Sequence, residues 1–295
     1  MKKYLSSIII VLSLFFLVVF LKEKDLFDYS ILTWNKSLIA SLFFLFLGFV
    51  LSGMSWWYAL KIHNVNIGYV EGVISHGLPI FSKYMPGKIW TILGRASRAA
   101  VNSENTISQL SFISLKEQLI YLLVGLIVSI VPVYLAYGVS LFLGFVLTSC
   151  LGLFLIVFNK TIHKFLLWLL YKILKKDLNI PLIKLRQGLK LSYYNLALWL
   201  SWTLAFYFFG SSFHESFSIQ LAFVFPISVV YGVLAIIMPG GIGVREGIIT
   251  AFLVASGLNI EVATTISVAS RLWFLLGETF MFVLSLLLSR VVKKR

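Results

Sequence analysis

The feature that most constrains the fold is a helix-breaking motif inside one of the most apolar regions of the chain. Residues 238–247 read MPGGIGVREG and lie between two apolar runs. In hydrocarbon, each unpaired backbone N–H or C=O costs several kcal/mol, so a broken helix persists there only where protein or a watery cavity covers it. The motif therefore predicts a re-entrant tip or a discontinuous membrane helix, a geometry that transporters use to bind ions and anions.

A second motif resembles the first. Residues 85–94 read MPGKIWTILG and match the Met, Pro, first Gly, Ile and last Gly of residues 238–247, 153 positions earlier. This offset is close to half of the 295 residues, so we expect two internal repeats, over about 37–137 and 191–289. Each repeat is built around one Pro-Gly break. The residues predicted to form the breaks are Pro86, Gly87 and Pro239.

The composition indicates a polytopic membrane protein. The chain is 60% hydrophobic and 12% charged, with a mean hydropathy of +0.96, whereas soluble domains carry about 25% charged residues. No polar segment is long enough to form a soluble domain, so we expect residues 1–295 to be one integral membrane domain. The net charge of +14 would favour a nucleic-acid partner in a soluble protein, but here it indicates topology and anionic lipid.

Apolar runs predict an all-α bundle of about six full membrane spans plus two re-entrant helical hairpins. The spans are expected over about 4–21, 37–60, 118–137, 139–158, 191–210 and 261–289, and the hairpins over about 70–101 and 217–256. The run 4–21 lacks a small-residue cleavage site and is typical of an uncleaved signal anchor.

Basic residues predict the orientation. Residues 160–190 carry eight Lys or Arg and one Asp, a surplus of +7 in one loop. We expect this loop, residues 83–98 and both termini to lie in the cytoplasm. The first hairpin would then open from the cytoplasm and the second from the opposite side, after three full spans. The repeats would therefore be inverted in a multi-pass protein of the cell (cytoplasmic) membrane.

Both breaks place cations beside helix N-termini. A half-helix that begins inside the membrane presents free N–H groups and the positive end of its dipole, which suit phosphate or carboxylate. The alternative is that the breaks only let helices pack closely. The residues predicted to form the substrate-binding site are Lys88, Arg95, Arg98, Gly240, Gly241, Gly243, Arg245, Glu246, Arg271 and Glu278.

Arg271 and Glu278 lie well inside the last predicted span, where a charge costs about 2.5–3.5 kcal/mol on insertion scales. Their seven-residue spacing puts them on one helix face, about 10 Å apart along the axis, so each needs a further partner. Arg245 and Glu246 are the expected partners. The alternative role is an ion-pair lock between the second hairpin and the last span. Weaker candidates, expected near the membrane interface, are Glu71, His76, Lys116 and Glu117.

Motifs for other chemistry are absent from the sequence. The four histidines lack metal-ligand spacing, and no ATP-binding phosphate loop occurs. We therefore expect no enzymatic activity, no cofactor and no metal. A membrane-embedded transferase would need a nucleophile or metal set that the sequence does not offer.

Residues 83–90 (KYMPGKIW) with Gly94-Arg95 after them, residues 238–247 and Ser270-Arg271-Leu272-Trp273 are three stretches that carry a resemblance. They are similar to the membrane region of lysylphosphatidylglycerol synthases and to the related stand-alone flippase-like proteins. The resemblance covers essentially the whole chain. It implies movement of aminoacylated phospholipid between leaflets, or a role in pathways of polyprenyl-linked sugars and surface glycans. The full synthases carry a separate soluble transferase domain, which this sequence lacks, so we expect no synthase activity.

The leading hypothesis is thus a lipid translocase, or lipid-handling protein, that acts on an anionic lipid. Cations at the two tips would bind the head group, while Glu246 and Glu278 hold the arginines or carry a coupling proton. The alternative from another class is a non-transporting scaffold that binds a lipid- or glycan-modifying enzyme through residues 160–190.

Overall fold

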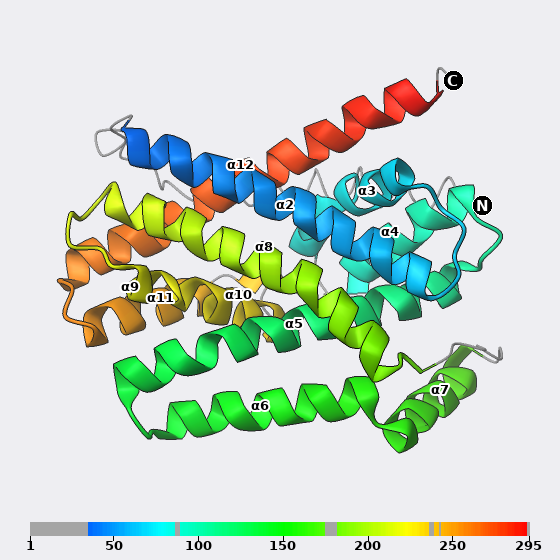
Figure 1. Ribbon diagram of the computed structural model, residues 1–295, viewed down its shortest axis with the longest axis horizontal. Coiled ribbons are helices and arrows are strands. Elements are labelled where there is room, and N and C mark those ends of the chain that lie inside the picture. Colours follow the sequence, from blue (N-terminus) through cyan, green and yellow to red (C-terminus); the bar gives the residue numbers. More distant parts are fainter. Residues whose placement is uncertain (1–34, 86–88, 175–181, 236–238, 242, 294–295) are drawn as a thin grey trace.

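The computed structural model describes residues 35–85, 89–174, 182–235, 239–241 and 243–293 (Figure 1). The first predicted span, over 4–21, lies outside the described residues, as do Pro86, Gly87 and Lys88. The elements are α2 (Lys36–Ile62), α3 (Tyr69–Gly77), η2 (Ile80–Tyr84), α4 (Ile89–Ala99), η3 (Ala100–Asn102), α5 (Ile107–Tyr137), α6 (Leu141–Phe158), α7 (Lys160–Leu174), α8 (Leu185–Ser211), α9 (Ile219–Ala222), α10 (Val224–Leu234), η4 (Pro239–Gly241), α11 (Val244–Ala255) and α12 (Ile260–Lys293). The predicted all-α class is confirmed, since every element in the described part is helical.

Local sequence determines where the long helices begin and end. The Asn35 side chain accepts a hydrogen bond from the Leu38 N–H (2.8 Å) at the start of α2. Thr106 and Gln109 form a reciprocal capping box at the start of α5. These side chains satisfy N–H groups that the first helical turn leaves free. At the end of α5, Gly138 has a φ of 61°, which favours glycine and turns the chain into α6.

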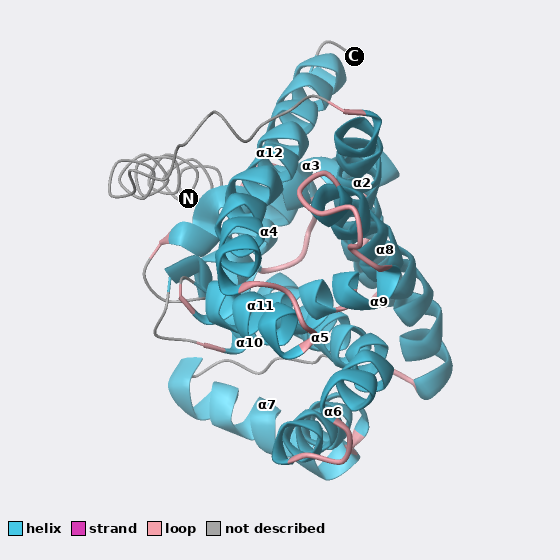
Figure 2. Cartoon of the chain, turned by 90° about the vertical axis from the view of Figure 1, so that its left-hand side faces the viewer, coloured by secondary structure: helices cyan, strands magenta, loops and turns pink. Residues whose placement is uncertain are grey.

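Two long helices, α2 and α8, form the most extensive packing contact and run side by side through the bundle (Figure 1). On one side of this pair, α5 packs against α8 and α10; on the other, α12 packs against α2 and α3. Helix α6 packs on α5, and α7 follows at its far end, so both lie on the periphery (Figure 2).

Short helices flank both predicted breaks. Before and after the first break, α3 has 9 residues and α4 has 11. Before and after the second, α10 has 11 residues and α11 has 12. A full span needs about 20 residues, so none of these helices could cross a bilayer alone. The two helices of each pair contact each other, α3 with α4 and α10 with α11.

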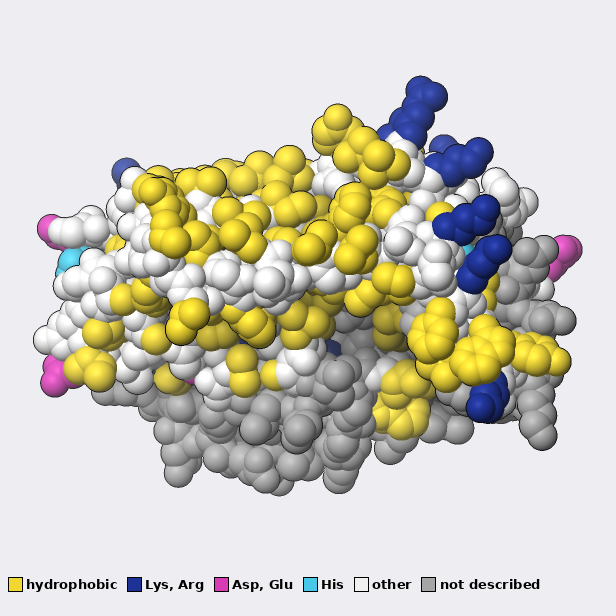
Figure 3. Space-filling view, turned by 90° about the horizontal axis from the view of Figure 1, so that it is seen from below, with side chains coloured by type: hydrophobic (Ala, Val, Ile, Leu, Met, Phe, Trp, Pro, Cys, Tyr) yellow, Lys and Arg dark blue, Asp and Glu magenta, His cyan; other side chains and the backbone are white. Residues whose placement is uncertain are grey.

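By length and composition, four of the described helices could cross a membrane: α2, α5, α6 and α12. Helix α8 is 27 residues long but less apolar, so it is outside this group. Large apolar side chains also cover the outside of the bundle, including Phe43, which is 63% exposed, and Leu141, which is 97% exposed. In Figure 3, apolar side chains cover the middle of one face, and Lys and Arg gather toward one end. The architecture is compatible with a membrane helix bundle.

Aromatic rings fill the centre of the bundle, where α2, α8, α10 and α12 meet. Phe49 and Phe274 each lie 5.0 Å, centroid to centroid, from Trp202. Phe225 of α10 lies 5.4 Å from Phe274. Such large rings bury much apolar area and fix the spacing between the helices. They also form one wall of the cavity described next.

Candidate functional site

The second break has a backbone that requires glycine. Gly240, Gly241 and Gly243 have φ values of 59°, 74° and 79°, which residues with a Cβ rarely adopt. A Cβ on Gly241 would also come within 2.7 Å of the Gly232 Cα on α10. The break therefore packs directly on the backbone of α10. Ile242, in the middle of the break, lies outside the described residues.

The two break regions meet inside the bundle. The 3₁₀ turn η2, which precedes the first break, contacts η4 of the second. A Cβ on Gly240 would lie 3.2 Å from the Tyr84 ring and 3.1 Å from Nη2 of Arg271. Tyr84 and Gly240, which are 156 positions apart in sequence (240 − 84), are thus neighbours in space. The third residue at this junction, Arg271, comes from α12.

A cavity of about 160 Å³ lies beside this junction. A single buried water needs only about 10–15 Å³ on a comparable measure, so the cavity could hold several waters or a small polar group. We call it the central cavity. Its charged and ionisable lining side chains are His76, Lys83, Arg95, Glu117, Tyr121 and Arg245. Apolar lining comes from the aromatic centre, and Gly240 contributes the break itself.

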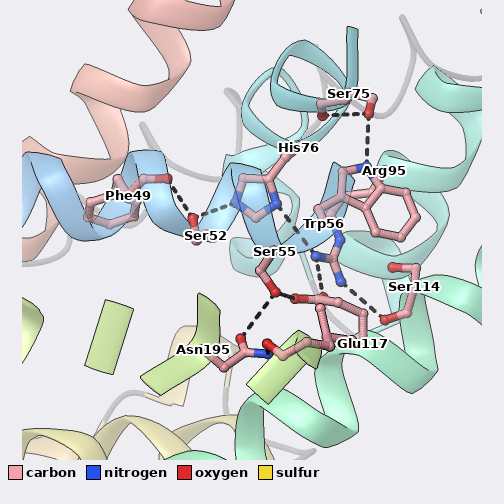
Figure 4. A network of polar contacts seen from close by, with 12 residues as sticks. Phe49, Ser52, Ser55, Trp56, Ser75, His76, Arg95, Ser114, Glu117 and Asn195 are labelled. Carbon is pink, nitrogen blue, oxygen red and sulfur yellow. Dashed lines mark hydrogen bonds and ion pairs between the residues drawn. The ribbon is translucent and has the colours of Figure 1, made fainter. Parts of the chain in front are cut away.

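Arg95 is held in a buried polar network (Figure 4). Arg95 Nη1 lies 2.8 Å from Glu117 Oε2, and Nη2 donates to the Ser114 carbonyl (3.2 Å). Glu117 also accepts from Ser55 (2.9 Å), which links α5 to α2. Both charged side chains are only 5% exposed, so each depends on the other for its counter-charge.

His76 extends this network, and its partners determine its tautomer. Its Nδ1 lies 3.5 Å from Arg95 Nη1, which can only donate, and its Nε2 lies 2.9 Å from Ser52 Oγ. The Ser52 hydroxyl in turn donates to the Phe49 carbonyl (2.7 Å). Nδ1 must therefore be the acceptor and Nε2 must carry the proton. His76 is a neutral part of the cavity wall.

Helix α12 is tied to both break regions by charge. Glu278 pairs with Lys83 and accepts from the Tyr84 hydroxyl (2.9 Å), both from η2. Arg271 donates to the Gly240 carbonyl (2.8 Å) and its Nε lies 3.3 Å from Glu246 Oε1. Glu246 Oε2 also accepts the Gly243 N–H (2.7 Å) at the start of α11. This N-terminus thus has a carboxylate from its own first turn.

Arg245 differs from the other cations of the central cavity. It is 6% exposed and has no ion pair among the described residues. Its guanidinium carbon lies 4.9 Å from the Phe274 ring centroid and 5.5 Å from that of Phe225. Within the described part of the chain, its Nε and Nη2 have no hydrogen-bond partner. These two nitrogens form the edge with which arginine binds carboxylate or phosphate in two parallel hydrogen bonds.

Space for the Arg245 side chain comes from a glycine. A Cβ on Gly232 would lie 2.5 Å from Cγ of Arg245. Rings on both sides attract the guanidinium by about 0.5–2 kcal/mol per contact, but burial of an ion costs several kcal/mol. The cost of this unpaired charge is therefore only partly offset.

The predicted site residues separate into groups. Arg95, Gly240 and Arg245 line the central cavity. Glu246, Arg271 and Glu278 lie next to it in the ion pairs of α12, while Gly241 packs on Gly232 and Gly243 begins α11. Arg98 pairs with Glu71 (3.3 Å) and is not among the lining residues. Lys88 lies outside the described residues.

Two expected partnerships and one expected location are settled by these contacts. Glu246 is a partner of Arg271, as predicted, but Glu278 pairs with Lys83 and Tyr84 rather than with Arg245. Glu117, expected near the interface, is 4% exposed and forms part of the cavity wall, because α4 packs over the first turns of α5. Lys83 lines the central cavity but was not among the predicted site residues. Its position two residues before Met85 of the first motif could have identified it.

Comparisons with protein-family models, curated proteins and solved structures found no match to this chain.

Proposed function

We propose that this protein is a lipid translocase, or lipid-handling protein, of the cell membrane that binds an anionic lipid head group in the central cavity. The observation that carries the proposal is Arg245, a buried guanidinium without a carboxylate partner in the described part of the chain. A bound anion would supply the missing counter-charge and remove the cost of burying the cation.

The charge balance of the central cavity favours an anion. Among the described residues, Lys83, Arg95 and Arg245 line it, against one lining carboxylate, Glu117. Glu278, which pairs with Lys83, brings the sum over these described residues to three positive and two negative charges. The excess of one positive charge falls on Arg245. A phosphodiester or carboxylate would neutralise it, while lipid chains remain in the bilayer.

The contacts of the short helices support the proposal that each break forms a re-entrant hairpin. Eleven or twelve residues extend about 17–18 Å at 1.5 Å per residue, well short of the roughly 30 Å hydrocarbon core. The two arms of a straight broken span would point away from each other. Here α3 contacts α4, and α10 contacts α11.

The packing pattern supports two repeats. Exchanging α2 with α8, α3 with α10, α4 with α11 and α5 with α12 turns one set of contacts into the other: α4–α5 corresponds to α11–α12, and α3–α12 corresponds to α10–α5. The α2–α8 contact and the η2–η4 junction map onto themselves. We propose that the repeats are inverted in the membrane, with both chain termini in the cytoplasm, as the basic loops predict.

The cargo is proposed as either an aminoacyl phospholipid or a polyprenyl-phosphate-linked sugar, following the resemblance to flippase-like proteins. Both carry phosphate, the group that Arg245 suits. We propose a binding role and no catalytic step.

Leaflet exchange in liposomes tests this function. The protein is reconstituted with fluorescent phosphatidylglycerol, aminoacyl phosphatidylglycerol or a polyprenyl-phosphate sugar, and exchange is followed by quenching of the outer leaflet. Arg245→Gln should slow exchange at least about tenfold, which corresponds to 1.4 kcal/mol. Arg98→Gln, which removes a cation outside the cavity, should leave the rate unchanged. Exchange no faster than in empty vesicles for all three lipids would refute the translocase.

The scaffold remains the second candidate, because α7 offers a surface of its own. Phe165, Trp168 and Tyr171 are 50–57% exposed there, and Lys172 lies 5.5 Å from the Trp168 ring centroid. A scaffold predicts the reverse result in cells: neutralising Lys160, Lys164 and Lys172 abolishes function, while Arg245→Gln preserves it.

A further inference from the structure

A second cavity, of about 700 Å³, lies away from the central cavity. Its wall is formed by residues from 128–136 at the end of α5, from 214–223 in the α8–α10 connection, and from 252–259 where α11 leads into α12. We call it the loop cleft. Its volume falls in the range of about 300–1,000 Å³ that is typical of small-molecule sites.

The described lining of the loop cleft combines apolar residues with polar ones. Its polar side chains are His214, Ser216, Ser218, Gln220, Ser256 and Asn259, and no Lys, Arg, Asp or Glu is among the described residues that line it. The described lining of the central cavity, by contrast, includes three cations. A charged head group would lose water in the loop cleft without gaining a counter-charge, which is costly. Hydroxyls, amides and imidazole suit a ligand that both donates and accepts hydrogen bonds.

One polar group of the cleft wall has unused hydrogen-bonding capacity. Nδ1 of His214 is buried and has no partner in the described part of the protein, and His214 lines the cleft. A buried polar group without a partner costs about 1–3 kcal/mol, so this nitrogen would gain from a ligand's hydroxyl.

One wall of the loop cleft continues into the apolar outside of the bundle. Val131 and Leu135 of α5 line the cleft and are 63% and 62% exposed. Helix α5 is also long and apolar enough to span a membrane. A molecule in the cleft can therefore place hydroxyl groups against the loops and an acyl chain along α5, which free sugar could not do.

We propose that the loop cleft binds the head group of an uncharged, hydroxyl-rich membrane lipid, such as a glycosyl diacylglycerol, with its acyl chains lying along α5. This binding requires neither leaflet exchange nor an anion in the central cavity. Along α5, Tyr121 of the central cavity and Val128 of the loop cleft are about 10 Å apart at 1.5 Å per residue. The two sites are thus separate places on the same helix.

Photo-crosslinking in nanodiscs tests the proposal. The protein is placed in phosphatidylcholine nanodiscs with monoglucosyl diacylglycerol that carries a photoreactive acyl chain. Ala255→Trp fills the cleft from an exposed position and should reduce labelling about tenfold, or 1.4 kcal/mol in binding. The matched control is Val254→Trp, because Val254 is exposed on the same helix but does not line the cleft.

Competition and a second variant complete the experiment. The double variant Ser216→Ala/Gln220→Ala removes hydrogen-bonding groups at exposed positions and should also weaken labelling. Unlabelled monoglucosyl diacylglycerol should displace the probe, whereas added phosphatidylglycerol, added phosphatidylcholine and free glucose should not. The proposal is wrong if Ala255→Trp and Val254→Trp label equally, if any of those three competitors displaces the probe as well, or if the double variant labels like the wild type. Arg245→Gln should bind the probe normally, so this result is independent of the translocase test.

Discussion

The two halves of the bundle use the same kind of contact with opposite polarity. In the first half, the short helix α4 carries the base, Arg95, and the following long helix α5 carries the acid, Glu117. In the second half, the short helix α11 carries the acid, Glu246, and the long helix α12 carries the base, Arg271. Both pairs attach a short helix beside a break to the long helix that follows it.

Comparing the two halves indicates that the charge of Arg245 is not needed to attach a short helix to the long helix that follows it. An ion pair attaches the short helix in both halves, whichever of the two helices carries the acid. At the 153-residue offset between the two motifs, Ile92 of the first half corresponds to Arg245 of the second. The first half thus manages with an apolar residue at that position. Arg245 has no ion pair among the described residues, so no carboxylate there uses its charge to attach α11 to α12. Three variants sharpen this comparison.

The largest effect is expected for the fully buried pair of the first half. Glu117→Gln leaves the Arg95 charge without its counter-charge, so the free energy of unfolding should fall by about 3–5 kcal/mol. Titration with sodium dodecyl sulfate in mixed micelles measures it. The double variant Arg95→Met/Glu117→Leu removes both charges and should recover most of the loss. If the double variant is as unstable as Glu117→Gln, then the hydrogen bonds of this pair to Ser55 and Ser114 account for the lost stability, and the unpaired charge does not.

A smaller loss is expected for the pair of the second half. Glu246→Gln keeps the side-chain shape, and Arg271 retains its hydrogen bond to the Gly240 carbonyl. Glu246 is also 18% exposed, so water replaces part of the contact. We expect a loss of about 1.5–3 kcal/mol in the same titration, typical of hydrogen bonds to charged groups. The matched control is Glu261→Gln at the start of α12, and a loss equal to that of Glu117→Gln would contradict the ranking.

The smallest effect on stability, and the opposite sign, is expected at Arg245. Arg245→Met keeps an unbranched stem beside Gly232 and removes a buried charge without a carboxylate partner, so the free energy of unfolding should equal or exceed that of the wild type. Leaflet exchange should fall in the same preparation. If Arg245→Met destabilises the protein as much as Glu117→Gln does, then Arg245 is structural and the two halves are equivalent.

The sequence predicted the long helices well, because each consists of a continuous run of apolar residues that begins and ends near residues typical of helix ends. The predicted span 37–60 corresponds to α2, and the predicted span 118–137 is the second part of α5, which begins at Ile107. Arg245 and Arg95 were accessible to prediction because each follows a Pro-Gly break. The spans 139–158 and 261–289 correspond to α6 and α12 within four residues at each end.

The sequence did not allow prediction of which residues the charged side chains contact. Lys83 and Glu278 are 195 positions apart, and only the crossing of η2 and α12 brings them together. Glu117 sits early in a 31-residue helix, and the sequence does not reveal that α4 covers that turn. The loop cleft likewise depends on three segments that carry no shared motif.

The seam between α2 and α8 limits how such a bundle could rearrange. Ser201 donates to the Phe44 carbonyl (2.7 Å) and Trp202 Nε1 to the Leu45 carbonyl (3.3 Å), both across this seam. In a bilayer no water would replace these bonds if the helices slid past each other. Gly48 also leaves no room for a Cβ, which would come within 2.3 Å of the Trp202 ring. We therefore expect any opening of the central cavity to leave the α2–α8 contact intact. The short helices α3, α4, α10 and α11 would move relative to that fixed pair.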